Sequence, residues 1–205
     1  MRQECSSIAD LMLLMASSIE EVAHAINQED AGRFLDEILN AKRIYVAGAG
    51  RSGLVAKAFA QRLMHLGFES YVIGETITPA FGLGDVLVAF SGSGETQSVV
   101  DVCETAREIG GKICLITATP SSHIGRMADC IVEIGNNRLK DTDIPRDFEI
   151  RQLTGQYRSV SQSFAPLGTL FETAALVFSD AIISALMEVK HCTVEELRGR
   201  LANVQ

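Results

Sequence analysis

Two segments rich in glycine and serine carry the residue types best suited to binding an anion. They are Gly48–Gly53 (GAGRSG) and Ser91–Thr96 (SGSGET), and each follows a short apolar run and opens a helix-like stretch. Backbone N–H groups at the start of a helix lie at the positive end of its dipole, and glycine lets a ligand approach the backbone closely. Together the two segments predict a cleft for an anion, above all a phosphate.

The surrounding sequence predicts a parallel sheet with helices on both faces. Apolar residues three or four apart in residues 7–40 indicate one long helix and a second short one at Ala31–Leu39. Beyond Arg43, short apolar strands alternate with helices, as in sheets that are buried on both faces. The expected strands are Arg43–Ala47, Ser70–Ile73, Val86–Phe90, Lys112–Thr117 and Cys130–Ile134. The expected helices are Ser52–Leu66, Thr96–Ile109, Ser122–Ala128, Leu167–Val189 and Thr193–Leu201.

A length of 205 residues fits one well-buried domain. We expect N-terminal helices in residues 1–40, a parallel α/β core in 41–135, an irregular loop in 136–163 and C-terminal helices in 164–205. Loops as long as 136–163 are uncommon unless they are functional or disordered. The many charges of this loop predict a flexible surface excursion, with a functional segment as the alternative.

The composition argues against several classes of partner. Nucleic-acid binding is carried largely by basic patches, whereas this chain has a net charge of −8. Its first residues lack the basic and apolar regions of a signal peptide. The most apolar stretch, Leu167–Val189, contains acidic residues and is a poor membrane span. We therefore expect a cytoplasmic protein with no nucleic-acid or membrane partner.

The cysteines predict neither a metal site nor a disulfide framework. They are odd in number, scattered and without paired metal-ligand spacing. Three of them fall inside expected strands or helices, where cysteine behaves as a small buried hydrophobe. The five are Cys5, Cys103, Cys114, Cys130 and Cys192.

A dinucleotide is the first alternative for the ligand. The glycines of Gly48–Gly53 match G-x-G-x-x-G after a strand, and Glu75 lies near the end of the next strand. Against this interpretation, Arg51 and Ser52 occupy the interior of the loop, and Glu75 falls after its strand. A dinucleotide also leaves Ser91–Thr96 without a role.

A sugar phosphate gives both segments a role, because ligands of open parallel sheets bind at the carboxyl ends of the strands. In this interpretation Gly50, Arg51 and Ser52 approach the sugar chain, and the second segment holds the phosphate. Serine and threonine are also common helix N-caps, which is the structural alternative for each hydroxyl. The expected phosphate ligands are the side chains of Ser91, Ser93 and Thr96 and the intervening backbone of Gly92 and Gly94.

These segments resemble a known family. Ser91–Thr96 is similar to the phosphosugar-binding loop of the sugar isomerase (SIS) domain. Val46–Leu54, Arg62–Phe68 and Gly168–Glu172 resemble the 6-phospho-3-hexuloisomerases more specifically, and the likeness is collinear from about Arg43 to Glu188. It implies a three-layer αβα sandwich with a five-stranded parallel, flavodoxin-like sheet and an N-terminal helical extension. It also implies a homotetramer with sites near subunit interfaces, and no metal or organic cofactor.

The same resemblance implies a reaction, the isomerisation of 3-hexulose 6-phosphate and fructose 6-phosphate, as in formaldehyde fixation. Moving a carbonyl between adjacent carbons requires a base and a donor that stabilises an enediolate. The family motif places the base at Glu172, for which interaction with a helix dipole is the alternative role. His65 is the expected acid or donor, acting across a subunit interface, or else a cation at a helix C-terminus. Arg51 is expected to contact substrate oxygens or to pair with an acid such as Glu95.

Two departures from the family pattern lie near the expected site. Relatives commonly end in Arg-His-Ala-Asn-Leu-Glu, whereas this chain ends in Arg200–Gln205 (RLANVQ), with Leu201 in place of the imidazole. The 136–163 loop also looks longer than the usual connection. An isomerase of another sugar phosphate, such as arabinose 5-phosphate, and a non-catalytic sugar-phosphate sensor therefore remain alternatives. A nicotinamide-dependent dehydrogenase is the weakest.

Overall fold

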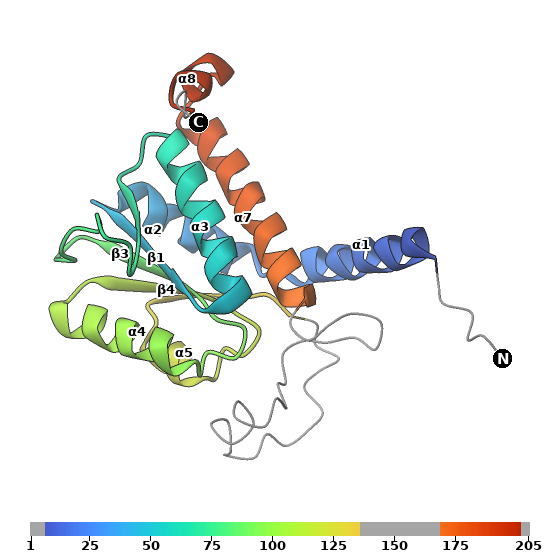
Figure 1. Cartoon of the computed structure of the whole chain (residues 1–205), viewed down its shortest axis with the longest axis horizontal. Helices are drawn as coiled ribbons and strands as arrows, with labels where there is room; N and C mark the ends of the chain where they lie inside the picture. The colour runs from blue at the N-terminus through green and yellow to red at the C-terminus, as the bar shows by residue number, and fades with distance from the viewer. Residues whose placement is uncertain (1–6, 136–168, 202–205) are drawn as a thin grey trace.

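Five parallel strands form the central sheet, in the order β2-β1-β3-β4-β5 (Figure 1). The computed structural model describes residues 7–135 and 169–201. The strands are β1 (Ile44–Gly48), β2 (Ser70–Val72), β3 (Val86–Phe90), β4 (Lys112–Thr117) and β5 (Cys130–Glu133). All four pairings between neighbouring strands are parallel, and β3 is buried along its whole length.

Helices cover both faces of this sheet. On one face lie α2 (Gln28–Asn40), α3 (Gly50–His65) and α7 (Thr169–Val189), and on the other α4 (Gln97–Ile109) and α5 (His123–Met127) (Figure 1). The N-terminal helix α1 (Ile8–Ala25) packs against α7 and extends beyond the sheet. A short final helix, α8 (Val194–Gly199), follows α7. The three-layer α/β sandwich with an N-terminal helical extension is therefore confirmed. The expected 136–163 loop lies outside the described residues.

Alternation along the strands builds two cores. In β1, Ile44 and Val46 face the α3–α7 side, whereas Tyr45 and Ala47 face the α4–α5 side. Phe34 of α2 joins the first core, where its ring lies 6.3 Å from the ring of Phe59. The strand and helix predictions hold because their apolar runs match these two buried faces.

Three of the cysteines are buried in these cores, as expected. Cys103 and Cys114 have no exposed surface, and Cys130 has 2%. Burial raises the pKa of Cys103 to about 12, so its thiol stays protonated at neutral pH. These residues therefore act as small hydrophobes.

Helix α7 is long and apolar enough to cross a membrane by composition alone, with a mean hydropathy of 1.7. In the fold, half of that stretch is buried, and α7 contacts α1, α2 and α3. It is thus a core helix of this sandwich. Its first turn carries Glu172.

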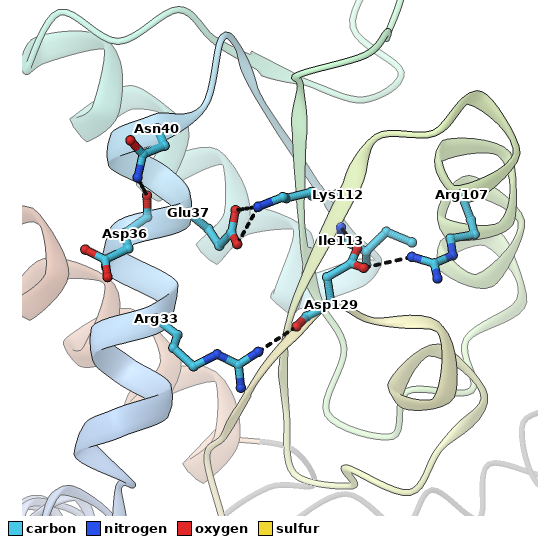
Figure 2. A network of polar contacts seen from close by, with 8 residues as sticks. All are labelled: Arg33, Asp36, Glu37, Asn40, Arg107, Lys112, Ile113 and Asp129. Carbon is cyan, nitrogen blue, oxygen red and sulfur yellow. Dashed lines mark hydrogen bonds and ion pairs between the residues drawn. The ribbon is translucent and has the colours of Figure 1, made fainter.

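Polar contacts hold the amino-terminal edge of the sheet together (Figure 2). One carboxylate oxygen of Asp129 accepts a hydrogen bond from Arg107 of α4, and the other accepts from the Ile113 N–H, both at 2.8 Å. Lys112 Nζ lies 2.7 and 2.6 Å from the two carboxylate oxygens of Glu37, and these contacts raise the pKa of Lys112. Helices from both faces are therefore attached to the starts of β4 and β5.

A buried ion pair closes the same edge beside β1 and β3. Asp85 has no exposed surface and accepts two hydrogen bonds from the Arg43 guanidinium, at 3.0 and 2.6 Å. The Gly82 N–H donates to it as well, at 2.7 Å. A buried charge requires such partners, because removing one leaves the other uncompensated.

We expect Asp85→Asn to lower the free energy of unfolding by about 3 kcal/mol, because the substitution breaks a buried charge pair. The matched control is Glu75→Gln, the same chemical change in the exposed Lys57–Glu75 pair, which should cost less than about 1 kcal/mol. Urea unfolding of both variants measures the difference. Equal losses would contradict a special role for the buried pair.

Candidate functional site

The two glycine-rich segments lie side by side at the carboxyl edge of the sheet. Strands β1 and β3 are neighbours, and their register places Gly48 beside Phe90. The helix that follows β1 covers one face of the sheet, and the helix that follows β3 covers the other. Such a change of side opens a crevice where open α/β sheets bind their ligands. The first segment is Gly48–Gly53 and the second is Ser91–Thr96.

The first segment is a tight turn that needs its glycines. A Cβ atom on Gly48 would lie 2.9 Å from the backbone of Ser52 and Gly53, so no larger residue fits. Gly50 has a φ of +57°, in the left-handed region that favours glycine. The chain can therefore turn from β1 directly into α3, with Arg51 exposed at the helix start.

The two helices that follow the glycine-rich segments lack side-chain caps. Ala49 precedes α3 and offers no capping group, and the Thr96 side chain before α4 makes no capping hydrogen bond. Four other helices are capped by their own side chains, namely those of Ser7, Asn27, Ser122 and Thr193. Helix starts require partners for their first N–H groups. At this site those donors are left for a ligand.

The unpartnered donors come from both segments. Across the part of the chain that the structure describes, the N–H groups of the following residues donate to no protein acceptor: Gly50, Arg51, Ser52, Gly92, Ser93, Thr96 and Gln97. Two uncapped helix starts also place the positive ends of two dipoles there. The edge therefore offers an array of hydrogen-bond donors suited to an anion.

The hydroxyl groups of the second segment partly organise the loop itself. Ser91 Oγ is buried and accepts a hydrogen bond from the Gly94 N–H at 3.1 Å, and Ser93 Oγ accepts from the Glu95 N–H at 3.2 Å. Gly94 has a φ of +63°, and a Cβ atom there would collide with Ser122. Each serine hydroxyl still has its hydrogen to donate to a ligand.

Glu172 lies at the mouth of the same crevice. Its carboxylate Oε2 is 2.6 Å from Nε of Arg51, and its side chain is 13% exposed, against 62% for Arg51. The preceding residue, Phe171, packs against Gly92, where a Cβ atom would lie 3.1 Å from the ring. The start of α7 therefore contacts both glycine-rich segments. The sequence did not predict this contact, because α7 lies far from both segments along the chain.

The expected Arg51–Glu95 pair is wrong. Glu95 instead accepts a hydrogen bond from the His123 N–H at 2.7 Å, at the start of α5, while Arg51 pairs with Glu172. The carboxylate of Glu95 therefore joins the second segment to the start of α5.

His65 does not join this group within one chain. It ends α3, roughly 21 Å along the helix axis from Arg51 at 1.5 Å per residue. It is 7% exposed, and its Nδ1 is buried without a hydrogen-bond partner. It lines a cleft of about 370 Å³ together with Leu201. His65, a predicted site residue, and Leu201, which departs from the family pattern, therefore line the same cleft.

The segment that supports the second loop was not predicted as part of the site. It comprises residues 117–124, from the last residue of β4 into the first turn of α5, and holds Gly92, Gly94 and Glu95 through hydrogen bonds. Its signal in the sequence is the cluster of threonine and serine residues after β4, Thr117–Ser122 (TATPSS). Such residues after a strand also favour ordinary turns and caps, so the signal is not specific.

Comparison with known proteins identifies the family of this chain. Residues 37–139 match the family model described as the SIS domain. A Bacillus subtilis relative named 3-hexulose-6-phosphate isomerase is 38% identical over 189 residues, covering 92% of this chain and 94% of the relative. A Mycobacterium gastri relative of the same name is 34% identical over 198 residues, covering 97% and 92%.

A solved structure is similar over nearly the whole chain. It is a Methanococcus jannaschii protein whose description infers a molecular function of 3-hexulose-6-phosphate isomerase. The TM-score is 0.78 and the sequence identity is 30%, covering 96% of this chain and 99% of that protein. The chain therefore belongs to the SIS-domain family, among relatives that are named 3-hexulose-6-phosphate isomerase.

Proposed function

We propose that this protein is a sugar-phosphate isomerase that interconverts 3-hexulose 6-phosphate and fructose 6-phosphate. The observation that carries the proposal is the position of Glu172, held 2.6 Å from Arg51 where both donor-rich segments meet. A carboxylate beside an anion site suits proton abstraction from a bound sugar phosphate. The relatives named for this reaction cover more than nine-tenths of the chain.

The phosphate is proposed to bind Ser91–Thr96, through the free N–H groups and the side chains of Ser91, Ser93 and Thr96. The sugar chain then extends toward Gly50, Arg51 and Ser52 at the start of α3. Two observations support this direction. The second segment carries several hydroxyl side chains, whereas the first carries that of Ser52 alone. Glu172 also lies against Arg51.

The reaction moves protons without a net change of oxidation state. Glu172 takes the proton from C2 of the 3-hexulose, giving an enediolate across C2 and C3, and returns a proton to C3. The hydroxyl proton passes from the oxygen on C2 to the oxygen on C3. Arg51 and the N–H groups at the start of α3 stabilise the negative charge that develops on these oxygens. The balance requires no cofactor.

The acid or donor is proposed to be His65 of a neighbouring subunit. Within one chain, the length of α3 separates His65 from Arg51. The two groups can therefore serve one site only if they come from different subunits. His65 supports this proposal because it lines an open cleft at the end of α3. We propose a cytoplasmic homotetramer, supported by the apolar residues that α1 exposes beyond the body of the fold (Figure 1): Ile8, Met12, Leu13 and Leu14.

Gly94→Ala should remove binding of phosphate, because the added Cβ collides with Ser122 and the φ of +63° disfavours alanine. Inorganic phosphate and fructose 6-phosphate should raise the melting temperature of the wild type but not of this variant. Gly32→Ala, on open helix surface, is the matched control and should keep the shift. A full shift in Gly94→Ala would contradict the assignment of the phosphate loop.

Glu172→Gln should lower kcat by at least ~10²-fold, because the amide cannot accept the proton. A coupled assay of 3-hexulose 6-phosphate, with arabinose 5-phosphate beside it, measures the loss. Binding of fructose 6-phosphate should persist. Glu188→Gln, an exposed carboxylate on the same helix, is the control and should be fully active. Normal turnover by Glu172→Gln would rule out the proposed base, and faster turnover of arabinose 5-phosphate by the wild type would change the substrate.

His65→Asn should lower activity by roughly 100-fold, at the lower end of general acid–base effects. Mixed oligomers of His65→Asn and Glu172→Gln chains should regain part of the wild-type rate, because some shared sites then contain both original groups. Mass spectrometry of the intact assemblies establishes that mixing has occurred. If the mixed oligomers are as inactive as the parents, either both groups act within one chain or His65 has no role in the reaction.

A further inference from the structure

The carbonyl oxygen of Gly92 accepts an unusual number of hydrogen bonds. The hydroxyl groups of Thr117 and Thr119 each lie 3.2 Å from it, and the Ala118 N–H lies 3.1 Å away. A carbonyl oxygen has two lone pairs, and most such groups in proteins have one or two partners. Three donors from one short segment therefore fix the orientation of the peptide group that follows Gly92.

The three donors are themselves linked. Thr117 has no exposed surface, and its hydroxyl accepts a hydrogen bond from the Thr119 N–H at 3.0 Å while donating to Gly92. The same segment continues to Ile124, whose N–H donates to the Gly94 carbonyl at 3.1 Å. The residues after β4 thus form a rigid base beneath the second segment.

The orientation of this peptide group determines where one free donor points. A trans peptide group directs its N–H opposite to its C=O, so the Ser93 N–H points away from the threonines. It has no acceptor within the described residues. Hydrogen bonds to the carbonyl polarise the peptide group and strengthen its N–H as a donor. The Phe171 ring also packs against Gly92, where an added Cβ atom would lie 3.1 Å from it.

We propose that Thr119, with Thr117, is a positioning residue that aims the Ser93 N–H at the bound phosphate. The inference rests on the proposed phosphate site and adds residues outside the glycine-rich segments to it. Thr119 acts through the Gly92 carbonyl and touches no reacting atom. Thr119 is the better residue to change, because it is only partly buried and its hydroxyl makes no other hydrogen bond in the described structure.

The test compares Thr119→Val, which keeps the shape of the side chain and removes the O–H, with Thr119→Ser, which keeps the hydroxyl. The dissociation constant of inorganic phosphate, measured by titration calorimetry, should rise about three- to tenfold in Thr119→Val, as expected for one hydrogen bond. KM should rise by the same factor with kcat unchanged, because the phosphate is held equally in the ground and transition states. Thr119→Ser should behave as the wild type.

Unchanged phosphate affinity in Thr119→Val, or an equal defect in Thr119→Ser, would overturn the proposal. If Thr119→Val does not fold, the amide spectrum of the wild-type protein decides. The Ser93 N–H signal should then be among those that phosphate shifts most, and an unshifted signal overturns the proposal. If the wild type binds phosphate but does not isomerise the hexulose, the proposed reaction is refuted. The ratio of phosphate affinities between the wild type and Thr119→Val still tests the role of Thr119 in that case. A wild type that neither binds phosphate nor isomerises the hexulose refutes both the proposed reaction and the proposed role of Thr119.

Discussion

Parallel pairing of β1 with β3 is the constraint on which the site depends. The register from Ile44 beside Val86 to Gly48 beside Phe90 ends both strands at one level. Their helices then leave to opposite faces of the sheet, which brings two uncapped helix starts together. The first N–H groups of these helices have no partner within the helix. At this edge they stay open to a ligand, and three of the residues concerned, Gly50, Arg51 and Gln97, are exposed.

The two edges of the sheet serve different purposes. At the amino-terminal edge, the carboxylates of Asp85 and Asp129 accept hydrogen bonds from arginine side chains and backbone N–H groups. At the carboxyl-terminal edge, glycines replace side chains and donors remain open. Arg51 and Glu172 compensate each other's charge at that open edge.

Most of the fold and half of the site could be predicted from the sequence. Strand β3, at Val86–Phe90, was predicted to the residue, because its apolar run fits a strand buried on both faces. The two glycine-rich segments were predicted as ligand-binding loops, because glycines directly after a strand indicate a turn with special backbone geometry. The contact between Arg51 and Glu172 was not, because it joins residues 121 apart in the chain and depends on how α7 packs. The role of Thr119 was hidden for the same reason, since its hydroxyl acts on a carbonyl of another loop.

Exchange of carbon-bound hydrogen tests the proton transfer most directly. Fructose 6-phosphate incubated with the protein in deuterium oxide should lose its proton signal at C3, the carbon that Glu172 is proposed to deprotonate when the reaction runs in reverse. Glu172→Gln should slow this exchange by at least ~10²-fold while still binding the sugar phosphate. Exchange at C1 in place of C3, or an equal rate in the wild type and Glu172→Gln, would contradict an enediolate formed at C2 and C3 by this carboxylate.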